Sequence, residues 1–280
     1  MKIRELLGVT RERLSSAGID EASLEAELLM RHALGQGAVQ LFLDLEKELG
    51  SQRERLLDTL VERRLSGEPL AYITGRREFY GLEFAVNPSV LIPRPETEHL
   101  VEKAIELVRQ IPAPIIADIG TGSGAIAISL AVNLPYARIY AADISPKALE
   151  TARDNAKRHK VEGRIKFLLG DLAAPLPEPV DILIANLPYV KSADCASSPE
   201  PHQALDGGIE GLDVIERLCG SLQGKLKPGG WVLLEIGQGQ EKRVRELLAA
   251  ALPGARIETI KDLAGIERVV CVHTLVTAKV

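Results

Sequence analysis

The chain of 280 residues has little cysteine, few aromatic residues and no excess of basic charge. Its three cysteines, Cys195, Cys219 and Cys271, form no C-x-x-C motif, and its five histidines form no H-x-x-x-H motif. These absences disfavour a disulfide framework, a structural zinc site and an iron–sulfur cluster. The net charge is −5, and no run of basic residues is longer than two. Proteins that bind nucleic acid through its phosphates usually have a basic surface, so we expect neither a metal nor a direct nucleic-acid partner.

Long apolar runs are also missing. No stretch approaches the ~18 consecutive apolar residues of a membrane-spanning helix. The N-terminal stretch MKIRELLGVTRERLSS mixes acidic and basic residues and has no apolar centre, unlike a secretory signal or an acid-poor transit peptide. We therefore expect a cytoplasmic protein without membrane contact. With 46% hydrophobic and 26% charged residues, the chain has the composition of a globular protein, and its length suggests about two domains.

The N-terminal part of the chain carries a helical pattern. Leucines recur at spacings of three and four, which predicts a helical domain over residues 1–70. Within it, Ser51 is expected to cap a helix, with Glu54 three residues later as in a capping box. Residues 71–92 favour short strands on either side of Gly81, which predicts a β-hairpin linker.

From residue 93 to residue 280, strands and helices alternate. The predicted strands are 115–119, 138–142, 164–169, 180–185, 231–236, 256–260 and 267–273, and the main helices are 97–110, 125–133, 145–160, 209–225 and 241–251. This alternation predicts an α/β fold with a seven-stranded, doubly wound, Rossmann-like sheet. The final two strands have no helix between them, so we expect the last strand to be antiparallel.

A glycine-rich loop, D-I-G-T-G-S-G, follows the first strand of this domain. Its glycines allow a sharp turn and a close approach of the backbone to a ligand, and the next helix begins with free amide donors. Asp143 ends the second strand about twenty residues later, where a carboxylate can accept both hydroxyls of a ribose. Asp171 ends the third strand and could accept a hydrogen bond from an adenine amino group. Three successive strand ends therefore predict a nucleoside site.

The loop leaves more than one interpretation open. Gly120, Gly122 and Ala125 also satisfy the G-x-G-x-x-A pattern of dinucleotide-binding proteins, with Asp143 in place for a nicotinamide cofactor. The glycines could alternatively serve only a tight turn. Asp118 ahead of the loop favours a third interpretation, because D-x-G-x-G-x-G resembles the S-adenosylmethionine loop of seven-stranded methyltransferases. In that fold the early carboxylate lies near the methionine end of the cofactor.

The sequence Asn186-Leu187-Pro188-Tyr189 follows the fourth strand, at the edge where ligands bind in such sheets. A planar amide or amino nitrogen is a weak nucleophile because its lone pair is delocalised. The Asn186 side-chain oxygen and the Leu187 carbonyl could accept its two hydrogens and so direct the lone pair at a methyl group. Pro188 limits Leu187 to extended conformations, and Tyr189 could pack on the flat substrate group.

Several longer motifs resemble the release factor glutamine methyltransferases, often called PrmC or HemK. They are E-P-L-A-Y-I-T-G at 68–75, F-Y-G-L at 79–82 and V-L-I-P-R-P-E-T-E at 90–98, together with the glycine loop and the Asn motif. The resemblance covers nearly the whole chain. It implies transfer of a methyl group from S-adenosyl-L-methionine, with S-adenosyl-L-homocysteine as product, to the glutamine side-chain amide of the Gly-Gly-Gln tripeptide in peptide chain release factors. It also implies that the N-terminal domain helps to bind the release factor.

These considerations give two groups of candidate site residues. The catalytic and substrate-binding candidates are Asn186, Leu187, Pro188 and Tyr189. The cofactor-binding candidates are Asp118, Gly120, Thr121, Gly122, Ser123, Gly124, Asp143, Asp171, Leu172 and Asn186.

The chain departs from the family at one position of the Asn motif. The family usually has Asn-Pro-Pro-Tyr, and here Leu187 replaces the first proline, which keeps the carbonyl but adds an N–H. Three other functions remain open: a nucleic-acid amino methyltransferase that acts on an extruded base, a nicotinamide-dependent oxidoreductase, and a non-catalytic protein of the same fold. The lack of a basic stripe disfavours the nucleic-acid methyltransferase. The lack of an evident proton donor disfavours the oxidoreductase, and the intact motifs disfavour a non-catalytic protein.

Overall fold

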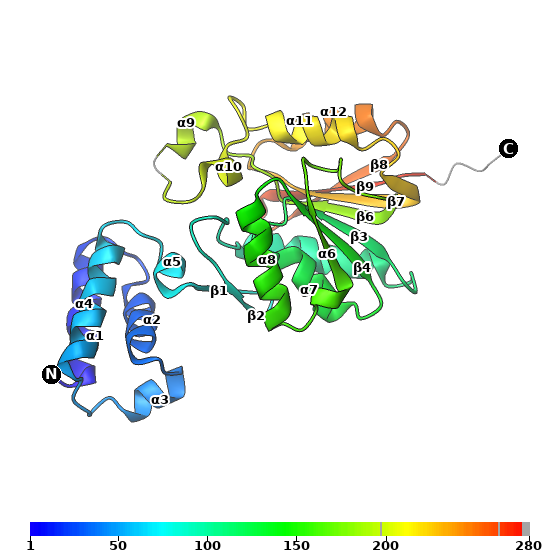
Figure 1. The fold of residues 1–280 in the computed structure, drawn as a ribbon. Helices are drawn as coiled ribbons and strands as arrows, with labels where there is room; N and C mark the ends of the chain where they lie inside the picture. Colours follow the sequence, from blue (N-terminus) through cyan, green and yellow to red (C-terminus); the bar gives the residue numbers. More distant parts are fainter. Residues whose placement is uncertain (197, 263, 276–280) are drawn as a thin grey trace. The chain divides into compact units, whose positions relative to one another are not determined.

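The computed structural model describes residues 1–196, 198–262 and 264–275 (Figure 1). Its contacts divide into two compact units, Met1–Arg76 and Arg77–Val280. Each unit contains its own cluster of buried hydrophobic side chains. Within the described ranges, no helix is long and apolar enough to cross a membrane.

The first unit is helical, as predicted. Its elements are α1 (Ile3–Ser16), α2 (Ala22–Leu34), α3 (Ala38–Leu43), α4 (Ser51–Leu65) and α5 (Leu70–Thr74). Its core consists of apolar side chains from these helices, including the fully buried Leu14, Leu29, Met30, Leu41 and Val61. Burial of each such side chain stabilises the fold by roughly 1.5–3 kcal/mol relative to exposure.

The predicted cap of α4 is wrong by one residue. The helix begins at Ser51 itself, and Gly50 occupies the cap position in an extended conformation with no side-chain hydrogen bond. Gly50 fits there because glycine is also tolerated at helix N-caps.

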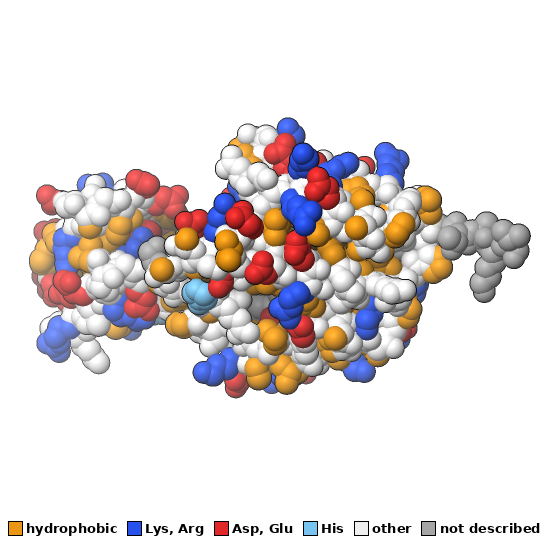
Figure 2. Space-filling view, turned by 90° about the horizontal axis from the view of Figure 1, so that it is seen from above, with side chains coloured by type: hydrophobic (Ala, Val, Ile, Leu, Met, Phe, Trp, Pro, Cys, Tyr) orange, Lys and Arg blue, Asp and Glu red, His pale blue; other side chains and the backbone are white. Residues whose placement is uncertain are grey.

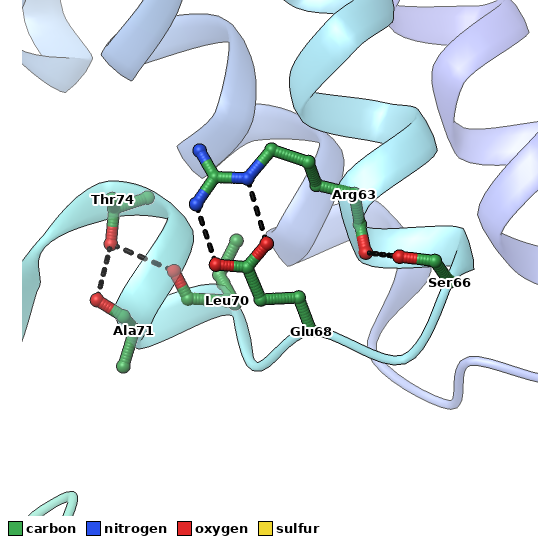
Figure 3. Close-up of polar contacts among 6 residues, drawn as sticks. All are labelled: Arg63, Ser66, Glu68, Leu70, Ala71 and Thr74. Carbon is green, nitrogen blue, oxygen red and sulfur yellow. Dashed lines mark hydrogen bonds and ion pairs between the residues drawn. The ribbon is translucent and has the colours of Figure 1, made fainter. Parts of the chain in front are cut away.

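Polar contacts join the end of α4 to the start of α5 (Figure 3). Arg63 donates two hydrogen bonds to Glu68, at 2.7 Å from Nε to Oε2 and 2.5 Å from Nη2 to Oε1. This pairing lowers the pKa of the Glu68 carboxyl. The Thr74 hydroxyl donates to the Leu70 carbonyl at 3.0 Å. The E-P-L-A-Y-I-T-G motif therefore has a structural role within this unit.

The predicted hairpin is present. It consists of β1 (Arg76–Phe79) and β2 (Leu82–Ala85). Tyr80 and Gly81 form its two-residue turn and both have positive φ, 51° and 70°, as the favoured hairpin turn requires. Phe79 and Phe84 are buried and meet edge to face, with ring centroids 6.1 Å apart. Both rings belong to a core of the second unit, so the hairpin packs with that unit.

A seven-stranded sheet forms the centre of the second unit. Its strands are β3 (Ile115–Ile119), β4 (Arg138–Asp143), β5 (Ile165–Leu169), β6 (Val180–Ala185), β7 (Leu226–Glu235), β8 (Arg256–Lys261) and β9 (Glu267–His273). They lie in the order β5-β4-β3-β6-β7-β9-β8. The first five pair in parallel, whereas β9 runs antiparallel to both β7 and β8. The predicted fold class, including the antiparallel last strand, is confirmed.

Helices cover both faces of this sheet (Figure 1). One face carries α6 (Glu98–Val108), α7 (Ala125–Asn133) and α8 (Pro146–Arg158), and the other carries α11 (Asp213–Ser221) and α12 (Glu241–Ala251). The central strands are apolar on both sides: along β6, Ile182 and Ile184 face one cluster while Leu183 and Ala185 face the other. Such strands are typical of parallel sheets buried on both faces.

The helix before β7 departs most from its predicted length. The segment expected to be helical from 209 to 225 forms α11 only over Asp213–Ser221. Gly211 has a φ of 75°, and a Cβ there would lie 2.3 Å from the Tyr189 carbonyl oxygen. The chain before α11 therefore turns tightly against the Asn motif and cannot continue the helix.

Candidate active site

A cavity of about 330 Å³ lies at the carboxyl end of the sheet. It is bordered by the loops that follow β3, β4, β5 and β6, by residues 89–97, and by parts of the segment 201–217. β3 lies between β4 and β6. The chain continues from β3 to β4 and β5 on one side and later crosses to β6 on the other side, so the strand order reverses at this point. This switch point is where open α/β sheets bind their ligands, and the volume is within the usual range for small molecules.

The glycine loop forms one wall of the cavity. Gly120, Gly122 and Gly124 have positive φ values of 74°, 55° and 83°, a region that favours glycine. A Cβ on Gly124 would lie 2.8 Å from Ile128 and 3.1 Å from Ala152, so this glycine allows close packing of the loop on α7 and α8. The loop residues that line the cavity are Gly120, Thr121, Gly122 and Ser123.

Asp118 lies beneath the loop and is fully buried, so it does not line the cavity. Its Oδ2 accepts the Thr121 hydroxyl at 2.6 Å and the Ala127 amide at 3.1 Å. Its Oδ1 has no partner in the described part of the chain. Burial, with a contribution from the charge of Asp143, raises the pKa of Asp118 to about 7. Asp118 thus supports the loop and retains one unsatisfied acceptor.

Asp143 ends β4 and does line the cavity. Its Oδ2 accepts the Gly122 amide at 2.9 Å, and its Oδ1 accepts the Ser145 amide at 2.8 Å. Burial raises the pKa of Asp143, although these hydrogen bonds oppose the shift. Each carboxylate oxygen has a second lone pair. Asp143 can therefore hold the loop and also accept hydroxyl groups of a ligand.

Asp171 and Leu172 follow β5 and line the same cavity. Arg217 of α11 donates to Oδ2 of Asp171 at 2.5 Å, a contact that the sequence did not predict. A ligand donor at Asp171 would therefore use Oδ1. Leu172 has a φ of 47°, a strained conformation for leucine of the kind that clusters at ligand sites.

The Asn motif forms the opposite wall. Nδ2 of Asn186 donates to the Thr97 hydroxyl oxygen at 3.0 Å, which leaves Oδ1 as the acceptor of that side chain. Leu187 is only 4% exposed, and a Cβ on Gly120 would lie 3.1 Å from its Cδ2. The Leu187 side chain therefore packs against the glycine loop, a contact beyond the carbonyl role expected from the sequence.

The structure brings Pro188 to the cavity but not Tyr189. The Tyr189 hydroxyl donates to Oε1 of Glu235 at 3.2 Å, and burial raises its pKa well above the usual value. Its backbone carbonyl accepts Nε2 of Gln240 at 3.0 Å. Tyr189 thus lies behind the wall that Asn186 and Leu187 form.

Sequence reasoning missed the contribution of residues 89–97 as site residues. Arg94 and Thr97 line the cavity, and Arg94 pairs with Glu200 of the 191–208 loop. Oε1 of Glu200 also accepts the Ile92 amide at 2.9 Å. Arg94 and Thr97 belong to the V-L-I-P-R-P-E-T-E motif, which indicated the family in the sequence but did not identify them as site residues. For Arg217 no signal was available.

Comparisons with known proteins agree with this architecture. Residues 5–75 match the model of the PrmC N-terminal domain, and residues 114–261 match that of a methyltransferase domain. The release factor glutamine methyltransferase of Moorella thermoacetica is 42% identical, over 96% of this chain and 97% of the relative. That of Koribacter versatilis is 39% identical, over 96% and 98%.

The chain belongs to the release factor glutamine methyltransferase family. The resemblance found in the sequence is thereby confirmed, and the enzyme class is methyltransferase. A solved structure, the ribosomal protein L11 methylase from Lactobacillus delbrueckii subsp. bulgaricus, has a TM-score of 0.52 and 21% identity. The match covers 68% of this chain and 84% of that protein, and it shows that the two share a fold.

Proposed function

We propose that the enzyme transfers a methyl group from S-adenosyl-L-methionine to the side-chain amide nitrogen (N5) of a glutamine in peptide chain release factors. The target is the glutamine of their Gly-Gly-Gln tripeptide, and the reaction takes place in the cytoplasm. The observation that carries the proposal is the Asn186–Thr97 hydrogen bond of 3.0 Å, because it leaves the Asn186 oxygen as an acceptor opposite the glycine loop.

The residues of the glycine-loop wall fit this cofactor. Asp143 can accept the two ribose hydroxyls and Asp171 the adenine amino group. In its ionised form, Asp118 with its unsatisfied Oδ1 would place negative potential beneath the loop, which suits a ligand with cationic groups. When bound, S-adenosyl-L-methionine supplies a methyl group on a sulfonium sulfur and is converted to S-adenosyl-L-homocysteine.

The Asn-motif wall would bind and orient the substrate amide. Oδ1 of Asn186 and the Leu187 carbonyl would each accept one amide hydrogen, so that the nitrogen lone pair points in line with the carbon–sulfur bond of the donor. Pro188 keeps Leu187 extended and aims its carbonyl. Tyr189 supports this wall from behind through its contact with Glu235. After transfer the nitrogen loses a proton, for which water suffices.

A protein substrate suits the charge of the chain better than a nucleic acid does. On the face drawn in Figure 2, Lys and Arg side chains are interspersed with Asp and Glu. The N-terminal helical unit exposes apolar side chains on α3, with Val39, Phe42 and Leu43 each at least 60% exposed. We propose that residues 1–70 form a domain that helps to recognise the release factor and that 71–92 link it to the catalytic domain, 93–280.

Labelled methyl transfer tests the substrate. The full-length enzyme should label a purified release factor and should fail to label the same factor with Gln→Ala in its Gly-Gly-Gln tripeptide. Ribosomal RNA and DNA, assayed in parallel, should remain unlabelled. Labelling of either nucleic acid together with an unlabelled release factor would overturn the proposal.

Removal of the N-terminal unit tests the proposed recognition role. Because each unit has its own core, residues 77–280 should still bind S-adenosyl-L-methionine. Their rate of release-factor methylation should fall far more than their cofactor affinity. A shortened enzyme that methylates the release factor as well as the full chain does would refute this part of the proposal.

A further inference from the structure

One buried side chain joins the β-hairpin to the glycine loop and has no part in the function proposed above. Asn155 lies on α8 and is fully buried. Its side-chain amide bonds to Ala85 of β2 and to Ser123 of the glycine loop, which are 70 and 32 positions away along the chain. A polar group buried this deeply destabilises the fold unless its hydrogen bonds are made.

Three hydrogen bonds use most of the capacity of the Asn155 amide. Nδ2 donates to the Ala85 carbonyl and to the Ser123 carbonyl, both at 2.9 Å. Oδ1 accepts the Ala85 amide at 2.8 Å. An asparagine amide has two hydrogens to donate, and both are in use here. These partners also fix which end of the amide faces the loop, because a flipped Asn155 would place its oxygen against two carbonyl oxygens.

The contact with Ser123 fixes the last peptide unit before α7. Asn155 holds the carbonyl of the Ser123–Gly124 peptide, and the Gly124 amide at its other end donates to the Thr121 carbonyl at 2.8 Å. A planar peptide that is held at both ends cannot rotate without losing both hydrogen bonds. Ser123 lines the cavity, and α7 begins two residues later at Ala125. Asn155 therefore helps to set the direction of the backbone amides that the start of α7 offers to a ligand.

The hairpin supplies the other end of this contact. Asn155 pairs with both backbone groups of Ala85, as a neighbouring strand would. Two exposed contacts join the same strand to the end of α8: Nη1 of Arg158 donates to Oε1 of Glu83 at 3.0 Å, and Nε2 of His159 lies 2.8 Å from the Glu83 carbonyl oxygen. Of these three side chains, Asn155 is the one that also bonds to the glycine loop. The segment predicted as a linker thus anchors the support of the loop.

We propose that Asn155 is a positioning residue, which holds the glycine loop in the shape that binds S-adenosyl-L-methionine and uses the hairpin as its anchor. The inference rests on the proposed function, because that function names the ligand of the loop. It assigns part of the cofactor affinity to a side chain that does not line the cavity. The residues proposed to orient the substrate lie in the opposite wall. Loss of Asn155 should therefore raise the Kd for the cofactor and leave kcat at saturating cofactor nearly unchanged.

Three substitutions in the full-length enzyme test this role. Asn155→Asp keeps the size and the acceptor for Ala85, but its ionised form has no hydrogen for Ser123. Asn155→Ala removes all three hydrogen bonds. At pH 8 the Kd for S-adenosyl-L-methionine should rise about 5- to 30-fold in both variants, and the KM for the release factor should change little. Arg158→Met is the matched control, because it removes a contact between the same strand and helix whose partner is Glu83 and not the loop, and its Kd should be unchanged. Calorimetry at a temperature where unfolding curves show every protein to be folded separates affinity from stability.

Asn155→Asp adds a readout that a purely structural role would not change. Its carboxyl would be buried and would face two carbonyl oxygens, so its pKa should be raised. Once protonated, it can again donate one hydrogen bond. The ratio of its Kd to that of the wild type should therefore fall between pH 8 and pH 5, whereas the ratio for Asn155→Ala should stay constant. All other titratable groups are the same in both proteins. On the adjoining elements they include Glu83, Asp118, Asp143, Arg158 and His159.

The outcomes separate the two proposals. Folded Asn155→Asp and Asn155→Ala enzymes that bind S-adenosyl-L-methionine as tightly as the wild type would overturn the inference and leave the proposed function intact. An equal loss of affinity in Arg158→Met, or a ratio for Asn155→Asp that does not change with pH, would overturn it as well. If Asn155→Asp does not fold, Asn155→Ala and the control decide. A wild-type enzyme that does not bind S-adenosyl-L-methionine would instead refute the proposed function.

Discussion

The two walls of the cavity are held in place by different kinds of contact. In the glycine-loop wall the backbone is bound directly: the Gly120 and Thr121 amides both donate to the Ala142 carbonyl, at 2.9 and 3.0 Å, and Asp143 accepts the Gly122 amide. In the Asn-motif wall the group proposed to bind the substrate is the Asn186 side chain, which is held by another side chain, that of Thr97.

We expect this difference between the walls to separate the binding of the cofactor from the orientation of the substrate. The glycine loop is held through its backbone by groups at the end of the adjacent strand β4. In the Asn-motif wall, Asn186 is held by Thr97 and Tyr189 is held by Glu235, partners that lie 89 and 46 positions away along the chain. We expect substitutions in the first wall to change cofactor affinity and substitutions in the second to change the rate.

The largest expected effect is that of Asn186→Ala. Loss of one oriented acceptor from a preorganised site should lower kcat by about 10²–10³. The variant should bind S-adenosyl-L-methionine as tightly as the wild type, because the glycine-loop wall is untouched. Calorimetry and labelled methyl transfer on the same preparation measure both quantities. A large loss of cofactor affinity in this variant would contradict the expectation that only the glycine-loop wall binds the cofactor.

Asp143→Ala should show the opposite pattern. Its carboxylate accepts the Gly122 amide and is proposed to accept the ribose hydroxyls, so affinity for S-adenosyl-L-methionine should fall by on the order of 2–3 kcal/mol. At saturating cofactor the rate should largely recover. Titration calorimetry checks the affinity, and unchanged binding would remove Asp143 from the site.

Asp118 makes the stability of the glycine-loop wall depend on pH. Its pKa is raised from 3.8 to about 7 in the folded protein. The folded state therefore binds a proton more tightly than the unfolded chain, and this contribution is lost as pH rises through 7. Between pH 5 and pH 8 the wild type should lose about 2–3 kcal/mol relative to Asp118→Asn. Denaturant unfolding of both proteins at the two pH values measures this, and parallel pH curves would contradict it.

Leu187→Pro should have the smallest effect. Proline keeps the carbonyl that the proposal uses, so kcat should be retained and could rise if the loop becomes stiffer. The lost packing against Gly120 should cost about 1 kcal/mol of stability. Thermal unfolding and methyl-transfer assays test both expectations. A folded, cofactor-binding and inactive variant would show that the Leu187 side chain or its N–H is required.

Much of the fold could be predicted because its signals are local. The apolar runs of β3 and β6 and the glycines between β3 and α7 identify their elements without reference to the rest of the chain. The end of a helix in contact with a distant loop could not be predicted in this way. The start of α11 is decided by the close approach of Gly211 to Tyr189, 22 positions earlier along the chain.

Within the site, too, contacts between residues far apart along the chain could not be predicted from the sequence. The sequence by itself determined the family and the order of strands and helices along the chain, since motif spacing and apolar periodicity are properties of neighbouring residues. Only the tertiary structure placed Asp118 below the cavity, turned Tyr189 towards Glu235 and joined Asn186 to Thr97. Side-chain hydrogen bonds between strand ends far apart in the chain form only when the sheet is assembled, so no local pattern could reveal them.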